Sequence, residues 1–245
     1  MSILLRHNGR MSSLMHRSFS TPANLEIWQR AQAVCFDVDS TVISDEGIDV
    51  LAAHCGQGEA VAAWTSKAMN GGVKFEDALA ARLNIIKPSK DAIAQCLGTH
   101  PPHLHLTKGI DQLIKELHRR KVDVYLVSGG FRLMIAPVAA HLSIPPTNIF
   151  ANTIYFDAKG EYSGFDANEL TSRDGGKPRV IEKLKSERQY KTVIMIGDGA
   201  TDMQAKPPAD LFIGFGGVVV REVVKKHADW YIHDFKELID GMGPL

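Results

Sequence analysis

The sequence predicts an α/β protein with a doubly wound, mainly parallel sheet and an inserted helical domain. Three short apolar runs, rich in β-branched residues, are each followed by polar residues, as buried strands are at their carboxyl ends (34–36, 122–127 and 192–196). Strand-like and helix-like segments alternate from Thr107 onward, which is typical of a parallel sheet. Residues 45 to about 106 have helical periodicity instead, so we expect the inserted domain there.

In chain order, the first expected element is a short helix from Leu25 to Gln32. The inserted segment should hold three or four helices, because its periodicity breaks at 55–58, 70–72 and 87–89. Further helices are expected at 109–120, 131–142, 177–189 and 218–227, strands at 149–151, 211–213 and 230–232, and a hairpin over 153–165. The chain thus divides into a flexible segment (1–25), an α/β core (26–44 and 107–245) and a helical domain (45–106).

The composition argues against several classes of protein. The chain has 245 residues, enough for one large or two small globular domains. Its formal net charge is zero and it has no basic stripe, so nothing indicates nucleic-acid binding. No apolar run approaches the roughly 20 residues of a membrane span. The three cysteines are scattered without C-x-x-C spacing, which indicates a reducing compartment rather than a disulfide or zinc framework.

The N-terminal segment differs in kind from the rest. Residues 1–25 contain several serines and three arginines, and no acidic residue precedes Glu26. This composition is typical of an organelle transit peptide, and the alternatives are a flexible leader without targeting value or a start at Met11. We therefore expect these residues to be flexible. We expect the protein to be cytoplasmic, with a mitochondrion or plastid as the alternative.

Two aspartates follow the first predicted strand directly. Asp37 and Asp39 are separated by one residue, so a strand would direct both carboxylates to the same face. Ligand sites of open α/β sheets lie at this end of the strands. Two carboxylates this close repel each other unless a metal ion, a shared proton or different protonation states for different roles reduce the repulsion. The alternative is a simple turn, in which Asp and Ser are common.

Three further motifs supply partners for these aspartates. Ser128 ends the second strand in Leu-Val-Ser-Gly-Gly, and Lys177 follows two glycines at a predicted helix start. Asp198 and Asp202 follow the strand at 192–196 in Gly-Asp-Gly-Ala-Thr-Asp. With these four motifs in this order, the chain resembles the haloacid dehalogenase superfamily of aspartate-nucleophile phosphotransferases from about Trp28 to Phe235.

The resemblance implies a covalent mechanism at these motifs. Asp37 would attack phosphorus to form an aspartyl-phosphate, and Asp39 would protonate the departing alkoxide and then activate water. The expected metal is Mg²⁺, held by Asp37, Asp198 and the main-chain carbonyl of Asp39. Asp202 would contact these ligands without binding the metal itself, or would act only as a helix cap.

The resemblance also assigns the groups that bind phosphate and substrate. Ser128, with the amides of Gly129 and Gly130, would hold the phosphate oxygens. Lys177 would supply positive charge, and its alternative is a solvated lysine placed against a helix dipole. Thr201 and Arg221 match positions near the substrate, although Arg221 alone would be interpreted as a surface charge.

The inserted domain corresponds to a cap that selects the substrate. Its pattern matches the serine-recognising branch of the superfamily, in which Glu46 would accept from an ammonium and Arg82 would hold a carboxylate. Met69 and Phe75 would exclude water, although both are otherwise typical of a helix core. Asn70 departs from the glycine that many relatives have there, and its side chain could change the affinity for the substrate.

The function implied is magnesium-dependent hydrolysis of O-phospho-L-serine, with this small molecule as the partner and neither nucleic acid nor membrane. One alternative is another small phosphomonoester or phosphotransfer to an alcohol, and another is a non-catalytic phosphoamino-acid-binding protein. The stretch Gly214-Phe-Gly-Gly217 lacks the dinucleotide fingerprint, and the chain has no P-loop. Whether the chain forms a homodimer is left open.

Overall fold

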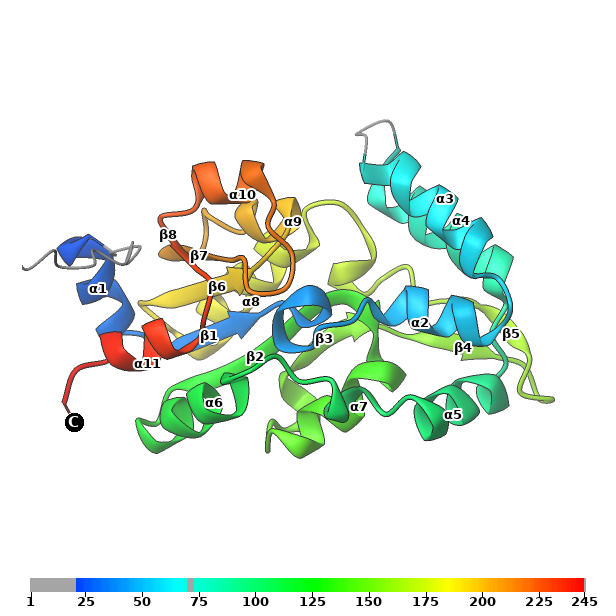
Figure 1. Cartoon of the computed structure of the whole chain (residues 1–245), viewed down its shortest axis with the longest axis horizontal. Helices are drawn as coiled ribbons and strands as arrows, with labels where there is room; N and C mark the ends of the chain where they lie inside the picture. The colour runs from blue at the N-terminus through cyan, green and yellow to red at the C-terminus, as the bar shows by residue number, and fades with distance from the viewer. Residues whose placement is uncertain (1–20, 70–72, 245) are drawn as a thin grey trace, which may run out of the picture.

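The computed structural model describes residues 21–69 and 73–244, and its centre is a six-stranded sheet (Figure 1). The strand order is β3-β2-β1-β6-β7-β8, and every neighbouring pair is parallel. The strands are β1 (Ala33–Phe36), β2 (Asp123–Phe131), β3 (Ile149–Asn152), β6 (Val193–Gly197), β7 (Leu211–Phe215) and β8 (Trp230–Ile232). This architecture confirms the predicted α/β class. The strand order reverses at β1, which makes its carboxyl end a topological switch point, where such sheets bind ligands.

Helices cover both faces of the sheet because alternate strand residues are apolar on both sides. Val34 and Phe36 of β1 belong to the hydrophobic cluster under α1 (Pro22–Gln29), α6 (Ile110–Arg119), α7 (Arg132–His141) and α11 (Lys236–Gly241). Ala33 and Cys35 belong to the opposite cluster, under α8 (Gly176–Arg188), α9 (Ala200–Met203) and α10 (Glu222–His227). In Figure 1, α6 and α7 lie below the sheet and α9 and α10 above it.

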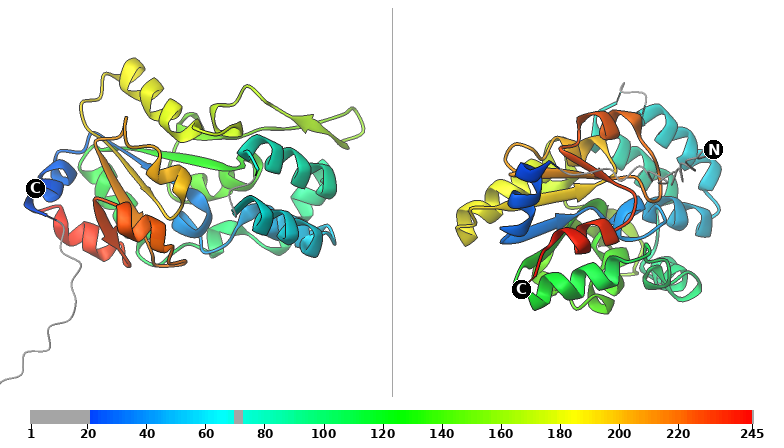
Figure 2. Two further views of the ribbon diagram at one scale, coloured as in Figure 1. Left: turned by 90° about the horizontal axis from the view of Figure 1, so that it is seen from above. Right: turned by 60° about the vertical axis from the view of Figure 1, so that its left-hand side comes forward.

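Four helices stand between β1 and β2 in the chain and form what we call the helical insert. They are α2 (Gly47–His54), α3 (Gly58–Met69), α4 (Phe75–Ile86) and α5 (Lys90–Thr99). Their apolar faces pack with Phe131 and Met134 of the core in a third hydrophobic cluster. The antiparallel hairpin of β4 (Ile154–Phe156) and β5 (Tyr162–Phe165) extends alongside them, as Figure 2 shows from above. The insert therefore shares its core with parts of the α/β body.

Two linkers connect the helical insert to the sheet, residues 43–46 on the way out and residues 100–106 on the way back. They run antiparallel, with a β-bridge between Ile43 and Leu106. The Ser44 amide donates to the His105 carbonyl at 2.9 Å. The two linkers are thus held side by side at the entrance to the insert.

Several element boundaries differ from those expected. Helix α1 begins at Pro22, three residues before the expected Leu25, because Thr21 caps it and proline is well suited to a first turn. Residues 22–25 are therefore helical and not flexible, while residues 1–20 lie outside the described chain. Helix α10 begins at Glu222, four residues later than expected. Short 3₁₀ turns occupy Pro102–Leu104, Pro146–Asn148 and Leu170–Ser172.

Candidate active site

The carboxyl end of β1 places Asp37 and Asp39 in a tight loop. The Asp37 amide donates to the Ile196 carbonyl of β6 at 2.9 Å, so Asp37 continues the sheet. Its carboxylate accepts from the Val38 amide at 2.8 Å. Ser40 then adopts a left-handed conformation with φ of 53°, which turns the chain sharply. Asp39 points back toward the insert, and its Oδ1 accepts from the Gly47 amide at 2.7 Å.

Asp39 is the carboxyl group whose environment most favours the neutral form. Burial, followed by the negative charges of Glu46 and Asp37, raises its pKa to about 8. The Gly47 amide and Lys177 act in the opposite direction but do not cancel these effects. The surroundings of Asp39 therefore favour its protonated form, which is the form that a general acid needs.

Lys177 lies at the centre of the site and contacts two aspartates. Its Nζ is 2.9 Å from Asp37 Oδ2 and 2.5 Å from Asp202 Oδ1. Burial alone would lower the pKa of Lys177, but Asp202 and Asp37 outweigh burial and raise it. The lysine is therefore a permanent positive charge beside Asp37 and not a solvated side chain.

Asp202 caps the N-terminus of α9 and forms an ion pair with Lys177. Its side chain is fully buried, and it accepts from the Gly199 amide at 2.9 Å at the start of α9. A Cβ on Gly197 would lie 2.2 Å from Asp202 Cγ, so a glycine is needed at the end of β6. Both alternatives considered for Asp202, a helix cap and a group near the metal ligands, thus match its position.

Three carboxylates converge in a way that could hold a metal ion. Oxygens of Asp37, Asp198 and Asp202 lie within 4.8 Å of one another. Asp198 accepts from Thr41 Oγ1 at 3.3 Å and from Arg221 Nε at 2.9 Å. Burial first, and then the charge of Asp37, raises the pKa of Asp198. Carboxylate oxygens at this density favour a hard divalent cation. The contribution expected from the main-chain carbonyl of Asp39 stays a prediction.

The last residues of β2 lie beside the aspartates. The strand runs to Phe131 and not only to Val127 as expected, and its register with β3 shifts between these two residues. Ser128 is buried, and its Oγ accepts from the Gly130 amide at 2.9 Å. A Cβ on Gly130 would lie 3.0 Å from Asp39 Oδ2, which shows how close this end of the strand is to the aspartate pair. A Cβ on Gly129 would lie 2.7 Å from Phe75 Cζ, so the ring of the insert covers the strand end directly. Small residues at these two positions keep the backbone accessible to a phosphate-sized group.

Two further charged side chains reach the site, Glu46 from the end of the outgoing linker and Arg82 from the helical insert. Glu46 Oε1 accepts from Ser40 Oγ at 2.8 Å, and burial is the main effect that raises its pKa. Arg82 is half-buried on α4, and its Nε donates to the Ala78 carbonyl at 3.2 Å. Burial lowers the pKa of Arg82, while the carboxylates of Asp49, Glu46 and Asp39 oppose that effect.

The structure describes the remaining predicted substrate residues to different extents. Arg221 pairs with Asp198 and lies 3.9 Å from Glu46, so it is a partner of the acidic groups and not an isolated surface charge. Thr201 is the second residue of α9, next to Asp202. Met69 ends α3, but its side chain is not described, and Asn70 lies outside the described residues.

Sequence reasoning missed several residues that the fold brings to the site. Thr41 contacts Asp198, and Ser40 contacts Glu46. Asp49 lies near Arg82, and its Oδ1 is buried without a hydrogen-bond partner within the described residues. The available signal was its spacing, since Asp49 is three residues after Glu46 and therefore on the same helical face. Asp174 accepts from the Phe75 amide at 3.3 Å and joins the insert to the segment before Lys177.

Comparison with known proteins identifies the class to which this fold and site belong. Residues 31–207 match the haloacid dehalogenase-like hydrolase family, and the chain belongs to that family. It is 56% identical over 209 residues to phosphoserine phosphatase of Rattus norvegicus, covering 85% of this chain and 92% of the relative. It is 52% identical over 236 residues to the chloroplastic phosphoserine phosphatase of Arabidopsis thaliana, covering 95% and 79%.

A solved structure supports the same grouping. The phospho-aspartyl intermediate analogue of a phosphoserine phosphatase aligns with a TM-score of 0.73 at 27% identity, covering 87% of this chain and all (100%) of the other. Within the part of the chain that the structure describes, no helix is long and apolar enough to cross a membrane.

Proposed function

We propose that this protein hydrolyses O-phospho-L-serine to L-serine and phosphate, the reaction that completes L-serine biosynthesis. The observation that carries the proposal is the arrangement at the end of β1. Asp37 is held beside the charged Lys177, and Asp39, two residues later, has a raised pKa that favours its protonated form. A nucleophilic carboxylate and a neutral acid side by side are what phosphate-ester cleavage through an aspartyl-phosphate requires.

In the first half-reaction, a carboxylate oxygen of Asp37 attacks phosphorus, and the bond from phosphorus to the serine oxygen breaks. Asp39 gives its proton to that departing oxygen. In the second, the Asp39 carboxylate takes a proton from a water molecule that attacks the same phosphorus, and Asp37 is released with phosphate. Lys177 and Ser128 would neutralise and orient the phosphate oxygens in both steps.

The acidic cluster suits Mg²⁺ as the cofactor. Asp37 and Asp198 would hold the ion, with Asp202 adjacent. When bound, Mg²⁺ would neutralise and orient the phosphate. The fit rests on charge, because the carboxylates of Asp37, Asp198 and Asp202 outnumber the two cations that contact them, Lys177 and Arg221, and a divalent cation would balance the excess negative charge.

Substrate choice would come from two charges, Glu46 at the end of the outgoing linker and Arg82 of the insert. The ammonium of phosphoserine would pair with Glu46, and its carboxylate would pair with Arg82, for which a planar guanidinium is well suited. The contact between Phe75 and Gly129 would exclude water from the covered site. Both relatives described above are named for the same substrate.

A phosphate-release assay over four phosphomonoesters tests the proposal against its alternatives. We expect phosphoserine to be turned over fastest. Phosphoethanolamine lacks the carboxylate, the phosphate ester of 3-hydroxypropionate lacks the ammonium and p-nitrophenyl phosphate lacks both, so all three should be poor substrates. Equal turnover of all four would favour a general phosphatase, and no turnover would favour a binding protein.

The nucleophile is tested by Asp37→Asn, because a carboxamide cannot attack phosphorus. We expect turnover to fall to background while the fold, followed by circular dichroism, is kept. Reductive trapping with borohydride during turnover should label Asp37 of the unmodified protein. Substantial activity in the variant would contradict the covalent mechanism.

Location and assembly are separate parts of the proposal. We propose the cytoplasm as the compartment, with the plastid as the alternative that the chloroplastic relative favours. A fluorescent fusion of the full chain, compared with one starting at Thr21, separates the two. Light scattering of the purified chain decides whether it forms a homodimer.

A further inference from the structure

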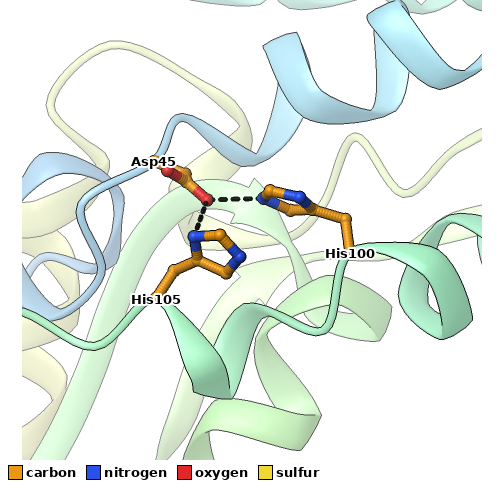
Figure 3. Close-up of side chains that lie close together, drawn as sticks. All are labelled: Asp45, His100 and His105. Atoms are coloured by element: carbon orange, nitrogen blue, oxygen red, sulfur yellow. Dashed lines mark hydrogen bonds and ion pairs between the residues drawn. The ribbon is translucent and has the colours of Figure 1, made fainter.

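A second group of metal-binding side chains lies outside the catalytic residues, where the two linkers meet. Asp45 Oδ2 is 2.7 Å from His100 Nε2 and 3.1 Å from His105 Nδ1 (Figure 3). The two imidazole rings are stacked, with centroids 3.9 Å apart. All three side chains are half-buried. One carboxylate oxygen therefore stands between two imidazole nitrogens.

The backbone holds these residues in place independently of their side chains. The Ser44 amide donates to the His105 carbonyl at 2.9 Å, which fixes His105 beside the residue before Asp45. His100 follows α5, and its amide donates to the Cys96 carbonyl at 2.8 Å. The 3₁₀ turn at Pro102–Leu104 then reverses the chain and returns His105 to His100. A preorganised set of ligands loses little conformational entropy when an ion binds.

Two imidazole nitrogens and one carboxylate oxygen form a donor set typical of zinc. Zinc binds such ligands at about 2.0–2.2 Å, so ligand atoms in a tetrahedral site are about 3.3–3.6 Å apart. The three ligand atoms already lie within 4.8 Å of one another. The two measured separations of 2.7 and 3.1 Å need to widen by less than about 1 Å to admit the ion.

A space for a water molecule adjoins two of the three ligands, Asp45 and His100, and it also reaches Asp39 of the candidate active site. A small cavity, lined by Asp45, His100, Gly47 and Pro102 among others, offers about 20 Å³ to the centre of a water molecule. That is enough for one water, which needs at least about 10–15 Å³. Three protein ligands and one water complete the coordination of a tetrahedral divalent cation.

We propose that Asp45, His100 and His105 form a binding site for a divalent transition metal, with Zn²⁺ as the best match, that joins the two linkers of the helical insert. Its nitrogen donors separate it from the all-carboxylate cluster of the active site, which suits a harder cation. Because one ligand comes from the outgoing linker and two from the returning linker, the bound ion holds the linkers together. Binding then restrains movement of the insert relative to the sheet and slows turnover.

Cobalt serves as the spectroscopic probe, because Co²⁺ occupies zinc sites and its absorption reports tetrahedral nitrogen and oxygen ligands. The full chain is titrated with Co²⁺ in excess Mg²⁺, so that the carboxylate cluster is blocked, and Zn²⁺ then displaces the cobalt. We expect one equivalent to bind with a tetrahedral spectrum. His100→Gln and His105→Gln should each weaken binding by at least about tenfold, the loss that even an outer partner of a metal ligand typically causes.

Two control variants make the outcome decisive. His54→Gln changes an exposed histidine of the same insert and should bind cobalt as the unmodified chain does. Asp198→Asn removes a carboxylate from the active-site cluster and should also keep the cobalt spectrum. Binding that survives both linker substitutions, or that is lost in Asp198→Asn, overturns the site.

Turnover of phosphoserine with added Zn²⁺ in excess Mg²⁺ gives the second readout. We expect inhibition of the unmodified chain and of His54→Gln, and relief of that inhibition in His100→Gln. Inhibition that is equal in all three overturns the restraint on the insert. The spectroscopic result does not depend on the proposed activity, so failure of one is distinguishable from failure of the other.

Discussion

Arg82 allows the sharpest test of how this protein recognises its substrate. Its half-buried guanidinium lies near Asp49 and Glu46, whose negative charges favour its protonated form. The substrate carboxylate has no other cation assigned to it in the proposed binding mode. Arg82→Ala should therefore impair hydrolysis of phosphoserine while leaving the phosphoryl chemistry at Asp37 intact.

The size of the effect follows from the burial of the guanidinium. Removing one member of a buried, hydrogen-bonded charge pair typically costs 2–5 kcal/mol. Because Arg82 is half-buried and not fully enclosed, we expect the lower part of that range, about 2–3 kcal/mol, or about 30- to 150-fold in kcat/KM. The loss of its charge also leaves Asp49 and Glu46 uncompensated, which adds repulsion toward the incoming carboxylate.

The assay compares kcat/KM for phosphoserine and for p-nitrophenyl phosphate, which has no carboxylate to lose. We expect the first to fall and the second to change by less than about threefold in Arg82→Ala. Arg82→Lys should give an intermediate loss, because it keeps the charge but not the planar fork. Arg188→Ala, which removes an exposed arginine from the end of α8, is the control and should change neither value. An equal fall for both substrates would show that Arg82 supports the fold or the chemistry and not substrate choice.

Three further predictions concern the metal, the acid and the cover of the site. Ca²⁺ should bind but not support turnover, because it accepts bidentate carboxylates and would engage both Asp37 oxygens. The test removes metal with EDTA and measures activity after adding Ca²⁺ or Mg²⁺. Equal rates with the two ions would refute the prediction. The pKa of Asp39 is raised to about 8, so its acid form is present below that pH and lost above it. The kcat for phosphoserine should therefore fall above about pH 8. The kcat for an aryl phosphate should fall less, because its leaving group needs no proton. Gly129→Ala should displace the Phe75 ring from residues 128–130, because the new Cβ would lie 2.7 Å from Phe75 Cζ. We expect kcat/KM for phosphoserine to fall about tenfold or more. An unchanged value would show that the insert moves aside freely.

The sequence alone predicted the α/β class and the residues that we propose to be catalytic. Asp37, Ser128 and Asp198 each come at the end of an apolar run and Asp39 comes two residues after Asp37, and parallel strands bring their carboxyl ends to one edge of a sheet. Chain position and strand direction are therefore enough to place these four residues together. The helical periodicity of 45–106 likewise predicted the α2–α5 insert, because amphipathic spacing is a local property.

Other features depend on which distant segments the fold brings into contact. Asp202 lies 25 residues beyond Lys177, and their ion pair forms because α8 and the start of α9 meet at the end of β6. Asp45 lies 55 residues before His100, and only the antiparallel course of the two linkers brings them within 2.7 Å. The raised pKa of Asp39 follows from burial, which local spacing does not encode. The local sequence thus determined which chemical groups are present, and the tertiary structure decided their partners and charge states, because burial and long-range contacts arise only when the chain is packed.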